Sequence, residues 1–128
     1  MKRNANLGTA FVILAVLAGL LAYAAAPDIT GTWIGTTEVP GAGVAELTLV
    51  IKKTPSGYGG TFSDTLGQVN KDAEITAVKL EGADLTFGFV LADGTPMTAR
   101  LKVDGDKMTG EWFLPEGGGG AMTFERKK

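Results

Sequence analysis

From Asp28 onward, apolar and polar residues alternate with a period of two, and turn-forming residues interrupt this alternation every 8 to 12 positions. The period is typical of half-buried β-strands, and such regular interruptions favour an antiparallel barrel or sandwich. Every interruption contains glycine, mostly with proline or aspartate, and these residues tolerate the dihedral angles of turns. No stretch after Pro27 has a convincing helical period. The sequence therefore predicts one all-β domain.

The alternation predicts eight strands joined by short loops. Their expected ranges are 29–39, 44–53, 58–66, 73–80, 85–91, 97–103, 108–114 and 121–126. Residues opposite each other in an antiparallel pair share a face, so apolar residues should lie opposite apolar ones. Loops of four or five residues satisfy this condition with Leu91 opposite Met97, Val103 opposite Met108 and Leu114 opposite Gly120. We therefore expect an eight-stranded up-and-down antiparallel barrel, with a two-sheet β-sandwich as the alternative.

One expected strand breaks the alternation. In the segment 73–80, Ile75 differs in parity from Val78 and Leu80, although all three are apolar. A β-bulge inserts one extra residue into a strand and can bring such residues back to a common face. We expect a bulge near Thr76-Ala77.

A glycine stands two positions before an aromatic residue on three of the expected strands. The three stretches are Gly31-Thr32-Trp33, Gly60-Thr61-Phe62 and Gly110-Glu111-Trp112. A glycine on the same face as the ring leaves room for a ring that leans along the strand, and it permits the coiling that closes a sheet. We expect Trp33, Phe62 and Trp112 to fill the inside of a strongly curved sheet.

These stretches carry a resemblance to known barrels. Thr30-Gly31-Thr32-Trp33 resembles the Gly-x-Trp of lipocalins and other calycin barrels, and also the Gly-Thr-Trp that opens avidin-type barrels. Most of residues 28–128 resembles small secreted bacterial β-barrel proteins of this lipocalin-like, calycin type, whose function is uncharacterised. The resemblance implies the fold. It does not imply biotin binding, because Ile34-Gly35-Thr36-Thr37 stands where avidin-type barrels continue with polar residues. In many lipocalins a late arginine covers the first tryptophan, and this implies either a lid formed by Arg126 or an Arg126 in solvent.

The first residues predict export. Lys2 and Arg3 precede an uncharged apolar run, and Ala22-Tyr23-Ala24 places small residues before a cleavage site. We expect residues 1–24 to be a signal peptide and residues 25–128 to be a single β-barrel domain in the periplasm or outside the cell. With the signal cleaved, we expect no stable membrane insertion. The alternative is a retained N-terminal membrane anchor, since the apolar run is just long enough to span a bilayer.

The absent residue types limit the chemistry. The sequence has no Cys and no His, which removes disulfides, thiolate metal sites and Ser-His-Asp catalysis. Lys and Arg are scattered, and this argues against nucleic acid as a partner. Asp104-Gly105-Asp106 resembles part of a calcium loop but lacks the later ligands, so we expect a hairpin turn there. We predict a protein that is not an enzyme and has no metal or cofactor.

We predict a binding module that takes a small apolar ligand at the barrel mouth. The candidate ligand-binding residues are Trp33, Tyr58, Phe62, Asp64 and Trp112. Asp64 shares parity with Phe62, so it is either an inward polar anchor or a turn-former that binds nearby backbone. The alternative function is a solid-core module that recognises a protein or the cell envelope without a small-molecule ligand.

Overall fold

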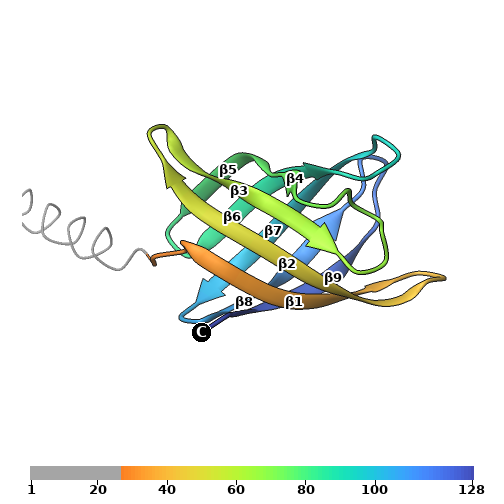
Figure 1. Ribbon diagram of the computed structural model, residues 1–128, viewed down its shortest axis with the longest axis horizontal. Coiled ribbons are helices and arrows are strands. Elements are labelled where there is room, and N and C mark those ends of the chain that lie inside the picture. Colours follow the sequence, from red (N-terminus) through yellow and green to blue (C-terminus); the bar gives the residue numbers. More distant parts are fainter. Residues whose placement is uncertain (1–26) are drawn as a thin grey trace, which may run out of the picture.

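The computed structural model describes residues 27–128 and shows a nearly closed antiparallel β-barrel (Figure 1). The strands are β1 (Gly31–Val39), β2 (Gly43–Thr54), β3 (Gly57–Asp64), β4 (Ala73–Glu74), β5 (Thr76–Glu81), β6 (Asp84–Val90), β7 (Pro96–Asp104), β8 (Lys107–Phe113) and β9 (Gly119–Arg126). The predicted signal peptide lies outside the described residues. The part of the chain that the structure describes contains no helix long and apolar enough to cross a membrane.

The strands follow one another around the barrel as an up-and-down meander. The order in the sheet is β4-β3-β2-β1-β9-β8-β7-β6-β5, so the first long strand pairs with the last. The β1–β9 ladder runs from Trp33 opposite Arg126 to Thr37 opposite Met122. The expected barrel is confirmed in its antiparallel, all-β and nearly closed character.

The number of strands differs from the prediction, because the described residues form nine strands rather than eight. The expected strand 73–80 is divided at Ile75 into β4, which pairs with β3, and β5, which pairs with β6. The chain changes partners at this residue, and the Ile75 amide donates to the Gly60 carbonyl at 3.1 Å. The Ile75 side chain is buried and belongs to the core.

The predicted bulge in this region is confirmed. The β5–β6 register shifts between Thr76 and Lys79, and Ala77 has a positive φ of 50°. The shift turns the Val78 and Leu80 side chains toward the core, against which both pack. The bulge therefore brings the apolar residues of β5 back to the inside of the barrel.

The predicted hairpin registers are correct in one case and shifted in two. Val103 lies opposite Met108, as expected. Met97 lies opposite Phe89 rather than Leu91, and Gly120 lies opposite Trp112 rather than Leu114. Both errors amount to two residues, which keeps every side chain on its predicted face because the side-chain period of a strand is also two.

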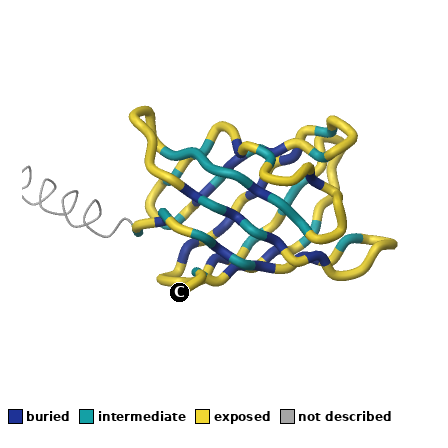
Figure 2. The backbone as a smooth tube through the Cα atoms, in the orientation of Figure 1, coloured by how far each residue is buried: buried dark blue, intermediate teal, exposed yellow. Residues whose placement is uncertain are grey.

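The core is the filled inside of the barrel. Buried residues alternate along the strands, as the dark segments in Figure 2 show. Phe62 lies at the centre of an aromatic cluster, with its ring 4.7 Å from Phe89, 6.2 Å from Phe87 and 6.5 Å from Phe124. Tilted and edge-on ring pairs of this kind contribute about 0.5–1.5 kcal/mol each beyond their buried area. The middle of the barrel is therefore solid.

Two of the glycines near the aromatic rings, Gly60 and Gly110, allow the backbones of neighbouring strands to approach each other closely. A Cβ at Gly110 would collide with the Arg100 carbonyl of the neighbouring strand, so Gly110 permits a close approach of two strands. Room for the Trp112 ring comes instead from Gly120, its partner across the sheet. A Cβ on Gly120 would lie 2.7 Å from Cζ2 of Trp112. The close approach at Gly110 fits the expectation that glycine helps the sheet to coil. The space for the Trp112 ring, however, comes from Gly120 on the neighbouring strand and not from the glycine two residues before the ring.

Candidate functional site

The two ends of the barrel differ in construction. β1, β3 and β8 run in the same direction, because the ladders between successive strands are all antiparallel. We call the end where these strands begin the capped end, and the end where they finish the open end. Figure 1 shows the C-terminus at the capped end and the β1–β2 hairpin extending beyond the open end.

Trp33 and Arg126 close the capped end. The Trp33 side chain is fully buried, and its indole Nε1 donates to the Ile29 carbonyl at 3.0 Å. The guanidinium carbon of Arg126 lies 4.3 Å from the centre of the Trp33 ring system. Of the two positions considered for Arg126, the structure shows the lid.

The Arg126 side chain is held by hydrogen bonds from all three of its nitrogens. Nη1 donates to the Thr30 carbonyl and Nη2 to the Asp28 carbonyl, each at 2.6 Å. Nε donates to a carboxylate oxygen of Asp106 at 2.9 Å. The planar guanidinium suits this arrangement, because its donors point in fixed directions while its face covers the indole.

Asp28 supports the same end through its own turn. Its carboxylate accepts hydrogen bonds from the Thr30 amide at 3.0 Å and from the Thr30 hydroxyl at 2.8 Å. These bonds stabilise the ionised form and hold the pKa of Asp28 below its ordinary value, with a smaller contribution from Arg126. The capped end is therefore a small polar network over a buried ring.

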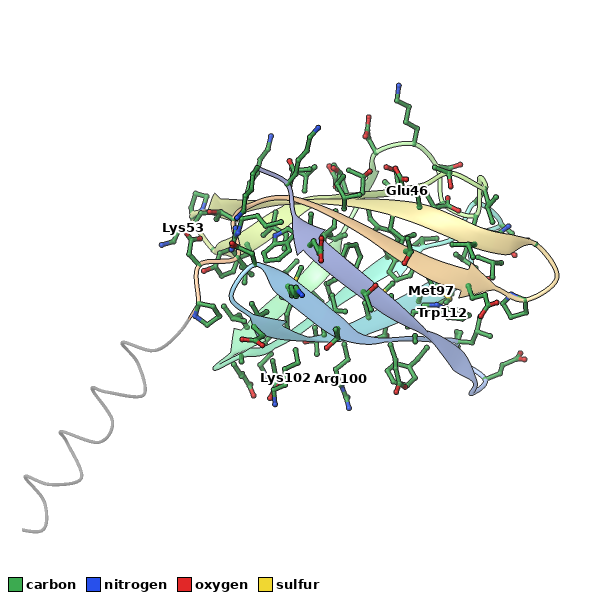
Figure 3. The ribbon with its side chains drawn as sticks, turned by 90° about the horizontal axis from the view of Figure 1, so that it is seen from below. Glu46, Lys53, Met97, Arg100, Lys102 and Trp112 are labelled. Atoms are coloured by element: carbon green, nitrogen blue, oxygen red, sulfur yellow. The ribbon has the colours of Figure 1, made fainter. Side chains whose placement is uncertain are left out.

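The open end contains a recess of about 70 Å³ that reaches the surface. Aliphatic, methionine and aromatic side chains form most of its wall. The lining residues are Thr37, Val39, Ala45, Leu47, Phe62, Asp64, Gln68, Val69, Phe89, Leu91, Met97, Trp112 and Met122. Figure 3 shows Met97 and Trp112 at this end, opposite to Lys53. The recess is the candidate functional site.

Trp112 is fixed in the wall of the recess by a short chain of hydrogen bonds. Its indole Nε1 donates to the Thr37 hydroxyl at 2.8 Å, and that hydroxyl donates to the Ala121 carbonyl at 2.6 Å. Thr37 is buried, whereas Trp112 is partly exposed. The ring therefore has a defined orientation and still meets solvent.

Asp64 organises the loop that borders the recess. One of its carboxylate oxygens accepts hydrogen bonds from the amides of Leu66 and Gln68, both at 3.2 Å, and the other accepts from the Val69 amide at 3.0 Å. This is the turn-forming arrangement that the sequence offered as one of two possibilities. Asp64 also lines the recess, and its role as a polar anchor for a ligand stays a prediction.

The loop places Val69 against the core. Val69 is buried and lines the recess. The Gln68 carbonyl accepts a hydrogen bond from the Ala92 amide at 2.8 Å, which ties the loop after β3 to the loop after β6. This contact bridges the two sides of the seam between β4 and β5 at the open end, so the loop narrows the mouth of the barrel.

The open end also carries exposed apolar side chains. Among the described residues, the large hydrophobic side chains that remain exposed are Val44, Leu66, Val90 and Leu114. All four lie at or beside the open ends of their strands. Val44 and Val90 have the opposite parity to the buried residues of β2 and β6, so they lie on the outer face of the barrel. We call these four residues the apolar rim.

The five residues predicted to bind a ligand divide between the two ends. Phe62, Asp64 and Trp112 line the recess. Trp33 lies beneath the Arg126 lid, and Tyr58 lies at the start of β3, also at the capped end. The structure therefore brings three of the five together and places the other two away from the recess.

Several lining residues were not among the candidates. Thr37 has the same parity as Trp33, so its inward position was readable from the sequence, and a threonine among core positions is a signal for a buried hydroxyl. Met97 and Met122 have core spacing and suit an adaptable pocket wall. Gln68 and Val69 lie in a loop without periodicity, where the sequence gives no comparable signal.

The polar groups of the site are engaged in hydrogen bonds within the protein. Residues 27–128 bring together no group of three or more His, Cys, Asp or Glu side chains that could hold a metal ion. Asp64 binds backbone amides, and the Trp112 and Thr37 donors are used within the wall. No protein-family model and no curated protein sequence matches this chain.

Proposed function

We propose that the protein is a non-enzymatic, exported barrel of the lipocalin-like type that binds a small apolar ligand at its open end. The carrying observation is the recess beside Trp112, because it is mostly apolar, reaches the surface and lies opposite the Arg126 cap. Sites for small molecules typically combine an apolar wall with a few placed polar groups. Asp64 supplies such a group here, and the hydrogen bond from Trp112 to Thr37 fixes the wall beside it.

The size of the recess limits the ligand. About 70 Å³ is well below the roughly 300–1,000 Å³ of pockets that enclose drug-sized molecules. It is also smaller than an engineered cavity of about 150 Å³ that takes up benzene. The recess therefore accepts the end of a short alkyl chain, and the rest of the ligand extends out of the recess.

Two further features support the lipocalin-like type of the barrel and its export. The Trp33–Arg126 pair fits the lid that the lipocalin-like resemblance implies. Export is supported by the sequence, through the positive start, the apolar run and the small residues at Ala22-Tyr23-Ala24.

Titration with n-octanol tests the proposal through tryptophan fluorescence. Trp112 borders the recess and Trp33 is fully buried, so the expected response is a saturable emission change that disappears in Trp112→Phe. The methyl NMR signals of Met97 and Met122 should shift in the same titration, while that of Met108, which lies outside the recess, should not. The absence of both responses at saturating octanol would refute small-ligand binding.

The apolar rim favours a second candidate function, which is recognition of a protein or of the envelope by a solid-core module. A photo-crosslinking residue in place of Val44, which is 65% exposed, should then capture a partner in cells. The matched substitution of Lys53, exposed at the capped end, should capture none. Equal capture at both positions would argue against the rim.

A further inference from the structure

The recess wall offers few free hydrogen-bond donors. Its polar side chains are Thr37, Asp64, Gln68 and Trp112. The indole N–H is used by the Thr37 oxygen, and the Thr37 O–H is used by the Ala121 carbonyl. Within the lining, the Gln68 side-chain amide is the remaining donor, and Gln68 is exposed at the edge. A ligand with an anionic head group would therefore find little to bind.

Asp64 adds negative charge to this wall. An ionised carboxylate only accepts hydrogen bonds and offers about four acceptor positions. The amides of Leu66, Gln68 and Val69 use three of these. By this count one position is left for a donor from a ligand, whereas a second carboxylate would meet a like charge.

The loops around the recess add further negative charge near Asp64. The segments that close the open end are 65–72, 91–95 and 114–118. Their charged residues are the acids Asp72, Asp93 and Glu116 and one base, Lys71. At the capped end acids and bases balance. The bases in its turns and at the C-terminus are Lys53, Lys107, Arg126, Lys127 and Lys128, and the acids are Asp28, Glu81, Asp84, Asp104 and Asp106. The loops around the recess therefore have a net negative charge, whereas the turns of the capped end are close to neutral.

From the scarcity of free donors, the Asp64 carboxylate and the acidic loops, we infer that the recess selects alkyl amines in their protonated form and rejects the corresponding carboxylates. The inference rests on the proposed function and names its ligand class. The alkyl end occupies the apolar recess among Phe62, Met97 and Met122. The ammonium group donates to Asp64 beside the partly exposed Trp112 ring, whose face also attracts cations.

Three probes with the same chain test the inference: n-octylamine, n-octanol and n-octanoate at pH 7. The expected order of affinity is octylamine, then octanol, then octanoate, with roughly a tenfold difference between the charged probes from attraction on one side and repulsion on the other. The preference should shrink in high salt, because screening weakens charge interactions near a surface. Calorimetry and the Met97 and Met122 methyl signals provide the readouts.

The possible outcomes separate the two proposals. Equal affinity for the three probes, or tighter binding of octanoate, would overturn the amine selection while leaving the apolar recess in place. No binding of any probe would refute small-ligand binding itself. The expected order of affinity supports both.

Gln68→Lys provides a matched test that keeps Asp64 and its loop hydrogen bonds intact. Gln68 is exposed and its side chain lines the recess, so the new ammonium group should strengthen octanoate binding and weaken octylamine binding severalfold. Asn70→Lys places the same charge in the same loop, outside the lining, and should change the preference less. A preference unchanged by Gln68→Lys, or moved equally by both variants, would overturn the inference.

Discussion

Trp33 and Trp112 both point into the barrel, but they are held in different ways. Trp33 is inaccessible to solvent, donates to a backbone carbonyl and lies beneath a guanidinium. Trp112 is partly exposed, donates to the Thr37 side chain and borders a recess. The same residue type thus closes one end of the barrel and lines the opening at the other. We therefore expect the capped end to contribute more to stability, and we propose the open end as the place of binding.

The strongest test of this difference compares alanine at the two tryptophans. Trp33→Ala should cost about 3–5 kcal/mol of unfolding free energy, because it removes a fully buried ring and leaves a cavity. Trp112→Ala should cost distinctly less, since that ring is partly exposed and already borders open space. Urea unfolding followed by circular dichroism gives both values. Equal losses would contradict the division of roles between the ends.

The Arg126 lid gives the next largest effect. Arg126→Ala should cost about 2–3 kcal/mol, because it removes charged hydrogen bonds to the Thr30 and Asp28 carbonyls and uncovers the Trp33 ring. Arg126→Lys should recover part of this, since an ammonium group keeps the charge but not the planar fork. Thermal and urea unfolding report the order of the three proteins.

Arg100 provides the control for the lid. Its guanidinium carbon lies 5.9 Å from the centre of the Phe113 ring on the outside of the sheet, where Arg100 is exposed. Arg100→Ala should therefore change stability by about 0.5 kcal/mol or less. A loss as large as that of Arg126→Ala would show that an arginine over a ring suffices and that the carbonyl contacts of the capped end add nothing.

Asp64 gives a smaller effect at the open end. Asp64→Ala should cost about 1–2 kcal/mol, because the amides of Leu66, Gln68 and Val69 lose their acceptor. In Asp64→Ala, hydrogen exchange of the Val69 backbone amide should accelerate more than exchange of the Trp33 backbone amide. The substitution loosens the loop after β3 and leaves the capped end unchanged. Protection of Val69 unchanged in Asp64→Ala would show that the loop is held by other contacts.

The faces of the strands were predictable, and so was the all-β barrel, because the period of two fixes which side chains point inward. The register was only partly predictable. A shift of two residues leaves Met97 opposite an inward residue whether the partner is Phe89 or Leu91, so alternation cannot choose between them. The division of one expected strand at Ile75 depends on which edge each half meets, and that is a property of the closed barrel.

The candidate site was predictable in its residues but not in its grouping. Parity placed Trp33 and Trp112 inside without saying at which end. The meander contained that information, because Trp33 lies near the start of β1 and Trp112 near the end of β8, and the two strands run in the same direction. Val69 was beyond prediction, since it reaches the core from a loop through hydrogen bonds to Asp64.

The smallest expected effect is the loss of stability at low pH, and we expect it to be similar at the two ends of the barrel. Asp28 lies at the capped end and Asp93 in an open-end loop, and the pKa of each is lowered, mainly by hydrogen bonds from Thr30 and Thr95 respectively. A carboxyl whose folded pKa is depressed contributes stability that is present above its unfolded pKa and is lost as the pH falls through the folded pKa. For an ordinary aspartate pKa of about 3.9, this places the loss below about pH 4.

Asp28→Asn and Asp93→Asn should therefore each reduce slightly the acid dependence of unfolding between about pH 4 and pH 2. NMR titration of the two carboxyl carbons in the unchanged protein provides the direct measurement, with both midpoints expected below the ordinary value. A normal midpoint for Asp28 but not for Asp93 would mean that the Thr30 turn is loose in solution. The network over Trp33 would then depend on the Arg126 bonds to backbone carbonyls, which do not titrate in this range, so the cap would persist in acid while its outer turn opened.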